Sequence, residues 1–133
     1  MKLYVIDACG LITFLRNEDG ADKFIQLLAD NTNTFLLHAL TAGEVYYDIL
    51  RMNKPKAEEL FRIIDDLQIG IIWTLDKELL HWAAYYKVNY KMSYADSYVL
   101  ATAYLNNACV ISTDHHEFDV VEQETDLCFY WLR

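Results

Sequence analysis

The sequence predicts a single α/β domain in which a parallel β-sheet lies between two layers of helices. Short apolar segments alternate along the chain with longer segments whose apolar residues recur every three or four positions. The chain is also dense in regular structure, because 54% of its 133 residues are hydrophobic and only four glycines and one proline occur. A length of 133 residues fits one domain over residues 1–133.

Five short segments have the composition of strands that are covered on both faces of a sheet. They are rich in branched aliphatic and aromatic side chains and are almost free of charge. Parallel strands need long crossover connections, and most of the intervening segments are long enough to supply helices. The predicted strands cover residues 3–6, 34–37, 69–74, 108–112 and 127–130.

Helical periodicity fills most segments between these strands, and several helix starts carry a marker. Thr41 and Glu44 form a capping-box pattern, and Ser93 and Asp96 form another. Pro55 occupies the favoured first turn of a further helix. Residues 115–119 are expected to form a loop. The predicted helices cover residues 8–15, 21–29, 41–52, 55–67, 76–90 and 94–105.

Four carboxylates are expected to meet at one edge of this sheet. Asp7 and Asp114 follow predicted strands, and open α/β sheets bind ligands beyond the carboxyl ends of their strands. Glu44 and Asp96 lie in the first turns of helices that can start at the same edge. Helix capping explains each acid taken alone. A cluster of four, however, is favourable chiefly when cations fill it, and oxygen ligands favour Mg²⁺ or Mn²⁺.

The segments around these acids resemble the four acidic motifs of the PIN domain. Asp7 lies in Val-Ile-Asp-Ala-Cys-Gly-Leu-Ile, and Glu44 lies in Leu-Thr-Ala-Gly-Glu-Val. Asp96 lies in Tyr-Ala-Asp-Ser-Tyr-Val-Leu-Ala-Thr-Ala, and Asp114 lies in Ile-Ser-Thr-Asp-His-His-Glu-Phe-Asp. The order and spacing of the motifs and the total length are similar to a single-domain member of the VapC-type toxin group.

This resemblance implies a metal-dependent ribonuclease on a five-stranded parallel sheet. It implies that Asp119 is an auxiliary acid and that the Ser112 hydroxyl orients a carboxylate or a water. For the toxin group it also implies an RNA substrate, a homodimer, and a cognate antitoxin protein whose tail covers the acidic site. The catalytic acids that would hold Mg²⁺ or Mn²⁺ are Asp7, Glu44, Asp96 and Asp114.

Two features depart from the family pattern, although neither removes an acid. Cys9 stands two residues after the first acid, where many members have a hydroxyl, and a thiol forms weaker hydrogen bonds. His115 and His116 follow the fourth acid. We expect exposed loop histidines, and contact with phosphate or a softer metal is the alternative.

The charge of the chain bears on any role with nucleic acid. Eleven Lys and Arg against twenty Asp and Glu give a net charge of −9, which opposes the approach of a polyanion. Binding of RNA would therefore depend on bound metal or on local cations. The densest group of cations is Arg51, Lys54, Lys56 and Arg62.

Cysteine spacing and hydropathy indicate the cellular compartment in which the protein is expected to act. Cys9, Cys109 and Cys128 are odd in number and widely spaced, so we expect three reduced and mostly buried thiols. The sequence has neither an apolar run of bilayer length nor the pattern of a secretory leader. A cytoplasmic protein that does not associate with membranes is expected.

The predicted helix over residues 76–90 has an unusually broad aromatic surface. Trp82, Tyr85, Tyr86 and Tyr90 cover more of the helix than one core contact needs. We expect part of this surface to contact a second copy of the chain.

Other functions stay open at this stage. A non-catalytic PIN-like module that binds RNA or protein could retain all four acids. A Mg²⁺-dependent receiver domain needs an acidic pair after the first strand, and a dehalogenase-type phosphatase needs Asp-x-Asp, whereas Ala8 and Cys9 follow Asp7. A Cys9 nucleophile would need a positioned base, and no histidine is assigned to that place.

Overall fold

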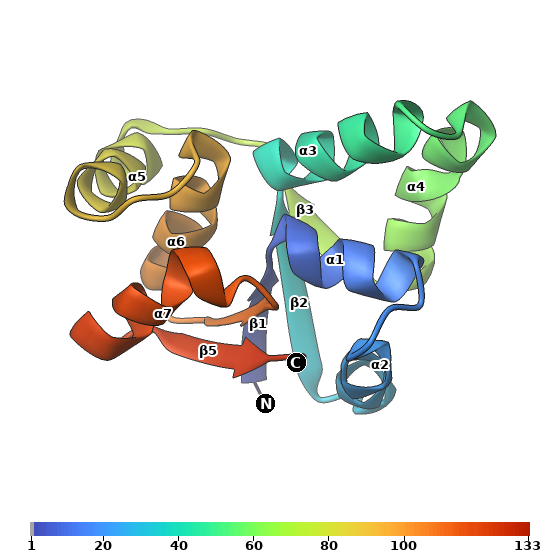
Figure 1. Ribbon diagram of the computed structural model, residues 1–133, viewed down its shortest axis with the longest axis horizontal. Helices are drawn as coiled ribbons and strands as arrows, with labels where there is room; N and C mark the ends of the chain where they lie inside the picture. Colours follow the sequence, from blue (N-terminus) through green and yellow to red (C-terminus); the bar gives the residue numbers. More distant parts are fainter. Residues whose placement is uncertain (1) are drawn as a thin grey trace.

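The computed structural model describes residues 2–133, which form seven helices around one five-stranded sheet (Figure 1). The strands are β1 (Lys2–Ile6), β2 (Asn33–His38), β3 (Ile69–Ile72), β4 (Cys109–Ser112) and β5 (Cys128–Trp131). The helices are α1 (Ala8–Leu15), α2 (Ala21–Ala29), α3 (Ala39–Leu50), α4 (Lys54–Asp66), α5 (Lys77–Asn89), α6 (Tyr94–Asn106) and α7 (His115–Glu124). The predicted α/β class is confirmed.

The order of the strands determines where a ligand site can form. The order is β3-β2-β1-β4-β5, and all four neighbouring pairs are parallel. From β1 the chain proceeds outward to β2 and β3, and it then crosses back to add β4 and β5 on the other side. In such sheets a crevice for ligands opens at the point where the order in which strands are added reverses its direction. That point lies between the carboxyl ends of β1 and β4.

The core has two parts, one on each face of the sheet. Successive residues of β1 point to opposite faces, so Tyr4 and Ile6 pack in one cluster and Val5 in the other. The first cluster lies under α1 to α4, and the second lies under α5, α6 and α7. These are the right-hand and left-hand groups of helices in Figure 1. Within residues 2–133 no helix has the length and apolar character that a membrane crossing requires.

The predicted loop at residues 115–119 is wrong, because these residues begin α7. The Asp114 carboxylate caps this helix by accepting a hydrogen bond from the backbone N–H of Glu117 at 3.1 Å. Phe118 and Val121 are buried three residues apart, which is the spacing of one helical face. The three polar residues at positions 115–117, which precede them, hid this periodicity in the sequence.

The capping box predicted at Thr41 is also wrong, because α3 begins earlier. The imidazole of His38 caps this helix, with Nδ1 accepting a hydrogen bond from the N–H of Leu40 at 3.1 Å. His38 Nε2 lies 3.0 Å from the carbonyl oxygen of Thr74, so this buried histidine has a structural role. The Thr41 hydroxyl is buried and has no hydrogen-bond partner among the described residues. At the second box, Ser93 caps α6 as predicted.

Cys109 and Cys128 form a disulfide, so the expectation of three reduced thiols is wrong for this pair. The two residues lie directly opposite each other on the adjacent strands β4 and β5, with their Cα atoms 4.5 Å apart. Cys128 is exposed, which also departs from the expected burial. Cys9 is the free cysteine of the described chain.

Candidate active site

Asp7 is a buried carboxylate at the tip of β1, and it is also the N-cap of α1. It is 1% exposed, and its Oδ1 accepts a hydrogen bond from the backbone N–H of Gly10 at 2.6 Å. A side chain at Gly10 would disturb this arrangement, because its Cβ would lie 3.0 Å from the carbonyl oxygen of Ile111. The same carboxylate therefore caps α1 and lies at the crevice between β1 and β4.

A hydrogen-bond chain through Ser112 connects the first acid with the fourth. The buried Ser112 hydroxyl donates to Asp7 Oδ2 and accepts from the backbone N–H of Asp114 at 2.9 Å. The tips of β1 and β4 are thus joined by side chains in addition to their backbone hydrogen bonds. Through these hydrogen bonds Ser112 contacts both of the acids that follow these strands.

Glu44 and Asp96 approach the same edge from helices α3 and α6. Burial raises the pKa of Asp96 to about 6, and the charges of Glu44 and Asp114 act in the same direction. Burial also raises the pKa of Glu44, with a smaller contribution from Asp48. Neither carboxylate is fully solvated, and each lies in the field of other carboxylates.

The pKa of the free cysteine, Cys9, is affected by all four acids. Burial raises the pKa of the Cys9 thiol to about 12, and all four predicted acids contribute to the increase. The charges of all four carboxylates therefore act on the position two residues after Asp7. A thiol with such a pKa stays protonated at neutral pH, which argues against Cys9 as a nucleophile.

The pKa of Asp7 is the most strongly perturbed of the four acids. Burial raises it to about 7, and the charges of Asp96 and Asp114 add to this effect. The hydrogen bonds from Ser112 and Gly10 lower it and so offset part of the increase. A carboxylate that is both dry and close to like charges is stabilised when a cation approaches.

The chemistry of these donors fits Mg²⁺ or Mn²⁺, since all four are carboxylates. Their positions are more open than a finished metal cage. Among residues 2–133, no three His, Cys, Asp or Glu side chains lie close enough together to hold an ion as they stand. Binding an ion would therefore require these side chains to move closer to one another.

Glu117 is a further acid near the site that sequence reasoning missed. Its charge contributes to the raised pKa of Asp96. It lies in the first turn of α7, three residues after Asp114, which is the spacing of a helix cap and its N3 residue. That spacing is visible in the sequence once residues 115–124 are recognised as a helix.

Asp119, the predicted auxiliary acid, pairs with a histidine on the outer side of α7. His115 Nδ1 lies 2.7 Å from Asp119 Oδ1, and Nε2 lies 2.8 Å from the carbonyl oxygen of Arg133. The His115 ring stacks on Trp131 with the ring centroids 3.8 Å apart. The hydrogen bond to Asp119 is the main cause of the raised pKa of His115. His115 and His116 are exposed as expected, although they lie on a helix.

The family assignment follows from the match of the sequence to known domains. The sequence model of the PIN domain matches residues 4–123, a span that includes all four acids. The chain belongs to the PIN domain family. A search of curated proteins found no sequence that matches the chain.

Solved structures show the same fold as this PIN domain. VapBC2 from Rickettsia felis, bound to a DNA fragment from its promoter, has a TM-score of 0.74 at 14% identity, covering 97% of this chain and 98% of that chain. VapBC-1 from nontypeable Haemophilus influenzae has a TM-score of 0.72 at 15% identity, covering 98% of each chain. VapC20 from Mycobacterium tuberculosis, a toxin that cleaves the sarcin–ricin loop, has a TM-score of 0.71 at 12% identity. The match covers 89% of this chain and 94% of that chain.

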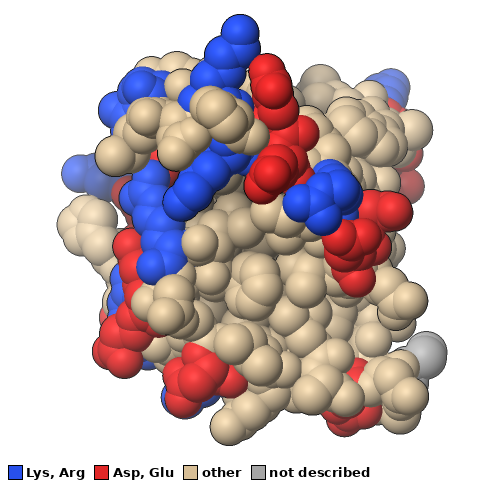
Figure 2. All heavy atoms as spheres, turned by 90° about the vertical axis from the view of Figure 1, so that its right-hand side faces the viewer, with Lys and Arg blue, Asp and Glu red and all other residues tan. Residues whose placement is uncertain are grey.

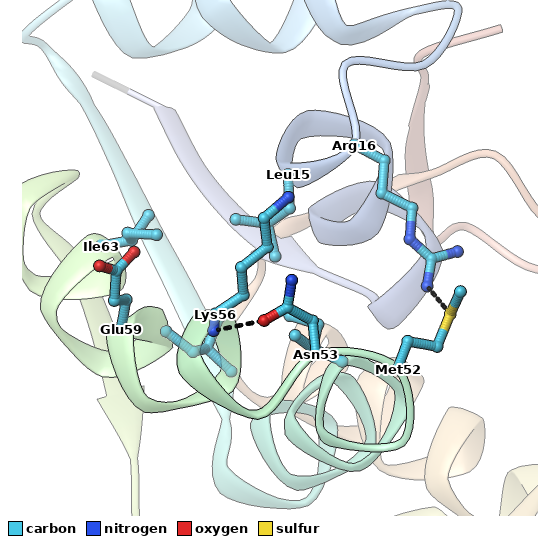
Figure 3. A pocket seen from close by; sticks show the side chains of 9 residues that line it. Leu15, Arg16, Met52, Asn53, Lys56, Glu59 and Ile63 are labelled. Atoms are coloured by element: carbon cyan, nitrogen blue, oxygen red, sulfur yellow. Dashed lines mark hydrogen bonds between the residues drawn. The ribbon is translucent and has the colours of Figure 1, made fainter.

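A groove of about 370 Å³ in this PIN domain begins at the far end of α1 (Figure 3). Leu15 from α1, Ile49 from α3, and Leu60 and Ile63 from α4 give it apolar walls. Asp7 caps one end of α1 and Leu15 forms the other, so the groove starts about 12 Å along the helix axis from the acids. A chain lying in the groove could follow α1 toward the acidic site.

Basic side chains gather beside this groove. Figure 2 shows the side of the molecule that carries the turn between α3 and α4, and its Lys and Arg side chains cluster in the upper part. Part of this positive charge is neutralised, because Asp48 forms ion pairs with Arg16 at 2.6 Å and with Arg51 at 2.8 Å. The predicted cationic group is therefore present, but it is mixed with acids.

Proposed function

We propose that this PIN domain is a metal-dependent endoribonuclease, that it is the toxin of a toxin–antitoxin pair, and that it acts in the cytoplasm. The observation that supports this most strongly is the convergence of four carboxylates at the switch point of the sheet, three of them with raised pKa values. Membership of the family and the likeness in fold to a toxin that cleaves RNA add support.

In the proposed mechanism the four acids, Asp7, Glu44, Asp96 and Asp114, hold Mg²⁺ or Mn²⁺. When bound, such an ion activates water and neutralises charge on a phosphodiester. Ser112 and the Gly10 N–H each fix one oxygen of the Asp7 carboxylate, and each oxygen keeps a second lone pair that can face a cation. The reaction needs no side-chain nucleophile, which agrees with a protonated Cys9 thiol.

The direct test is cleavage of a panel of structured RNAs by the purified protein in Mg²⁺, Mn²⁺ or EDTA. We expect discrete products with either ion and none in EDTA. The same ions should raise the melting temperature of the protein, because they bind the folded state only. Cleavage that persists in EDTA would contradict the metal-dependent mechanism. A preference for Zn²⁺ that disappears on replacing His115 and His116 would assign the metal to the histidines instead.

The second candidate function is a module that binds RNA or protein without cleaving it. It is favoured by one observation, namely that the acids of residues 2–133 are too far apart to hold an ion as they stand. The assay above distinguishes the two functions. Saturable RNA binding in Mn²⁺, with intact RNA recovered after long incubation, would support the binding module and contradict the nuclease.

We also propose that a segment of the cognate antitoxin occupies the groove beside α1. The solved relatives in fold include toxin–antitoxin complexes, which supports an antitoxin as partner. The groove offers apolar walls to the side chains of such a segment, and Lys56 on its rim can pair with an acidic group of that segment. A segment that continues along α1 would bring its end to the carboxylates and would block access of RNA.

This docking site can be tested by co-expression with the product of a neighbouring reading frame that forms a complex. Ile63→Glu places a charge in the groove and should weaken the complex by at least tenfold. Ile25→Glu is the matched control, since Ile25 is half exposed on α2 and does not line the groove. Equal effects of the two substitutions, measured by titration calorimetry, would contradict this location.

We further propose a homodimer formed through the outer face of α5. Leu80 and Val88 are 47% and 84% exposed, and the exposed Ala84 lies between them at helical spacing. Apolar stripes of this kind are typical of contacts between subunits. Light scattering of the wild type at about tens of micromolar, where weak dimers form, should give the mass of a dimer. Val88→Glu should give the mass of a monomer, whereas Val120→Glu on α7 should not.

A further inference from the structure

A second and larger cavity lies at the opposite edge of the sheet from the acids. Its volume is about 720 Å³, which is within the range of sites for small molecules. Its walls come from α5, α6, the amino ends of β1, β4 and β5, and the segment between α7 and β5. None of the four acids and no residue of the groove beside α1 contributes to it.

The aromatic surface predicted on residues 76–90 faces this cavity. Trp82 packs against Tyr104 of α6 with ring centroids 4.3 Å apart, and it contacts Tyr85 edge-to-face at 5.3 Å. Burial raises the pKa of Tyr86 to about 12, and the phenols of Tyr104, Tyr85 and Tyr90 add to the increase. The ring of Tyr86 lies 5.5 Å from that of Tyr85 and 6.4 Å from that of Tyr90, measured between centroids, so the aromatic rings form a continuous surface.

The lining of the cavity also includes two exposed acidic residues. Glu124 and Asp126 line it, and among residues 2–133 neither has a Lys, Arg or His as an ion-pair partner. Glu124 contributes, after burial, to the raised pKa of Tyr90, so this carboxylate lies near the aromatic wall. Lys2 is the cation in the lining, and its Nζ lies 5.6 Å from the ring centroid of Tyr4, a residue that does not line the cavity.

We propose that this cavity binds a small organic cation that carries protonated amino groups on an aliphatic body. Aromatic faces attract such cations, and the effect is strongest where water is excluded. Glu124 and Asp126 would pair with ammonium groups, and the tyrosine oxygens would accept N–H hydrogen bonds. A phosphate would meet these carboxylates with like charge, and a neutral ligand would leave them unpaired.

A disulfide lies in the wall of the cavity. Cys109 and Cys128 line it, and their disulfide fixes the amino ends of β4 and β5 relative to each other. A pocket that is formed before binding loses less affinity to ordering of its walls. This inference concerns the edge remote from the acids and does not depend on the proposed nuclease.

The test is a titration of the full chain with spermidine at low ionic strength, followed by NMR and by calorimetry. We expect saturable shifts of resonances around Trp82, Tyr104 and Leu127, which line the cavity. The double substitution Glu124→Gln with Asp126→Asn should weaken binding by at least tenfold. Glu58→Gln with Asp65→Asn is the matched control, because it removes two exposed charges on α4 and should change the affinity by less than twofold.

A second pair of variants tests the aromatic wall. Tyr104→Leu should weaken spermidine binding severalfold, and Tyr104→Phe should retain it, because phenylalanine keeps the aromatic face. The proposal is overturned if the two double variants lose affinity equally, which would show unspecific attraction to an acidic protein. It is also overturned if the shifts map to the acids at the other edge, or if the neutral 1,8-octanediol binds as tightly as spermidine.

Discussion

The two edges of the sheet contribute in opposite ways to the stability of the domain. At the carboxyl edge, β1 and β4 end in acids that are buried and repel one another, so that the pKa of Asp7 rises to about 7. At the amino edge, β4 and β5 are joined by a disulfide beside a wall of aromatic rings. The comparison teaches that the carboxyl edge stores repulsion that a ligand can relieve, while covalent and apolar contacts elsewhere keep the domain folded.

The largest effect should come from a change of charge at the carboxyl edge. Asp96→Asn is almost isosteric and leaves Ser93 in place to cap α6. It removes a charge from a site whose metal affinity depends on charge, so we expect RNA cleavage to fall by at least about 100-fold. The melting temperature should stay the same or rise, because the repulsion among the acids decreases.

The control for Asp96→Asn comes from the amino edge, where Tyr104→Leu should leave cleavage within about twofold. Both variants should be compared in cleavage rate, Mn²⁺ affinity and melting temperature. Retained cleavage in a destabilised Asp96→Asn protein would show that this acid only supports the helix start, and it would contradict its assignment to the site.

Opening the disulfide should have the largest effect on stability. Cys128→Ser releases a loop that spans 19 residues. The loss of this cross-link should lower the free energy of unfolding by about 3 kcal/mol, since the unfolded chain gains freedom. Urea unfolding would measure the change, and cleavage by the folded variant should be unchanged. Reduced wild type should match the variant, and a clear difference between them would show that the substitution acts by another route.

The pH dependence of stability should differ in sign from that of most acidic proteins. The folded-state pKa of Asp7 is about 7, so the folded protein keeps a proton that the unfolded chain has already lost above pH 4. Stability in the absence of divalent ions should therefore fall as the pH rises from about 4 to 7, by an amount on the order of 4 kcal/mol.

Asp7→Asn should remove most of this slope, and Asp126→Asn at the amino edge should leave it in place. Urea unfolding at a series of pH values in EDTA measures the slope. Addition of Mg²⁺ should reduce the slope in the wild type, because the ion replaces the proton as the partner of the carboxylate. An equal slope in wild type and Asp7→Asn would show that the repulsion lies elsewhere.

The smallest effects on cleavage are expected for two acids of α7, and they should differ in size. Glu117 raises the pKa of Asp96, so Glu117→Gln should reduce cleavage severalfold. Asp119 pairs with His115 and is exposed, so Asp119→Asn should reduce cleavage by about twofold or less. Cleavage rates at saturating Mg²⁺ would decide the order. A larger loss for Asp119→Asn would support Asp119 as the auxiliary acid.

Much of the fold and of the candidate site could be predicted because the pattern there is local. The alternation of apolar strands and periodic helices determines a parallel sheet, and strand boundaries differ from the prediction by about two residues at most. Asp7 and Asp114 could be located because parallel strands end at one edge. The start of α6 could be predicted because the Ser93 hydroxyl accepts a hydrogen bond from the backbone N–H of Asp96, only three residues later.

The errors arose where distant segments decide the outcome. The start of α3 depends on the imidazole of His38, which is held by the carbonyl group of Thr74 on another segment. The disulfide depends on β4 and β5 being neighbours in register, which no spacing of cysteines reveals. That much of the aromatic surface of α5 lines a cavity likewise depends on five other elements, so the sequence could not reveal it.

The sequence alone therefore determined the fold class, the order of the elements and the four acids that could converge, because hydrophobic periodicity and strand tips are properties of short segments. Only the tertiary structure decided the hydrogen bond from Ser112 to Asp7, the pairing of Asp119 with His115, and the burial that raises the pKa values. These features depend on the distance between atoms that are far apart in the chain and on the exclusion of water around them. Both are set only when the helices pack on the sheet.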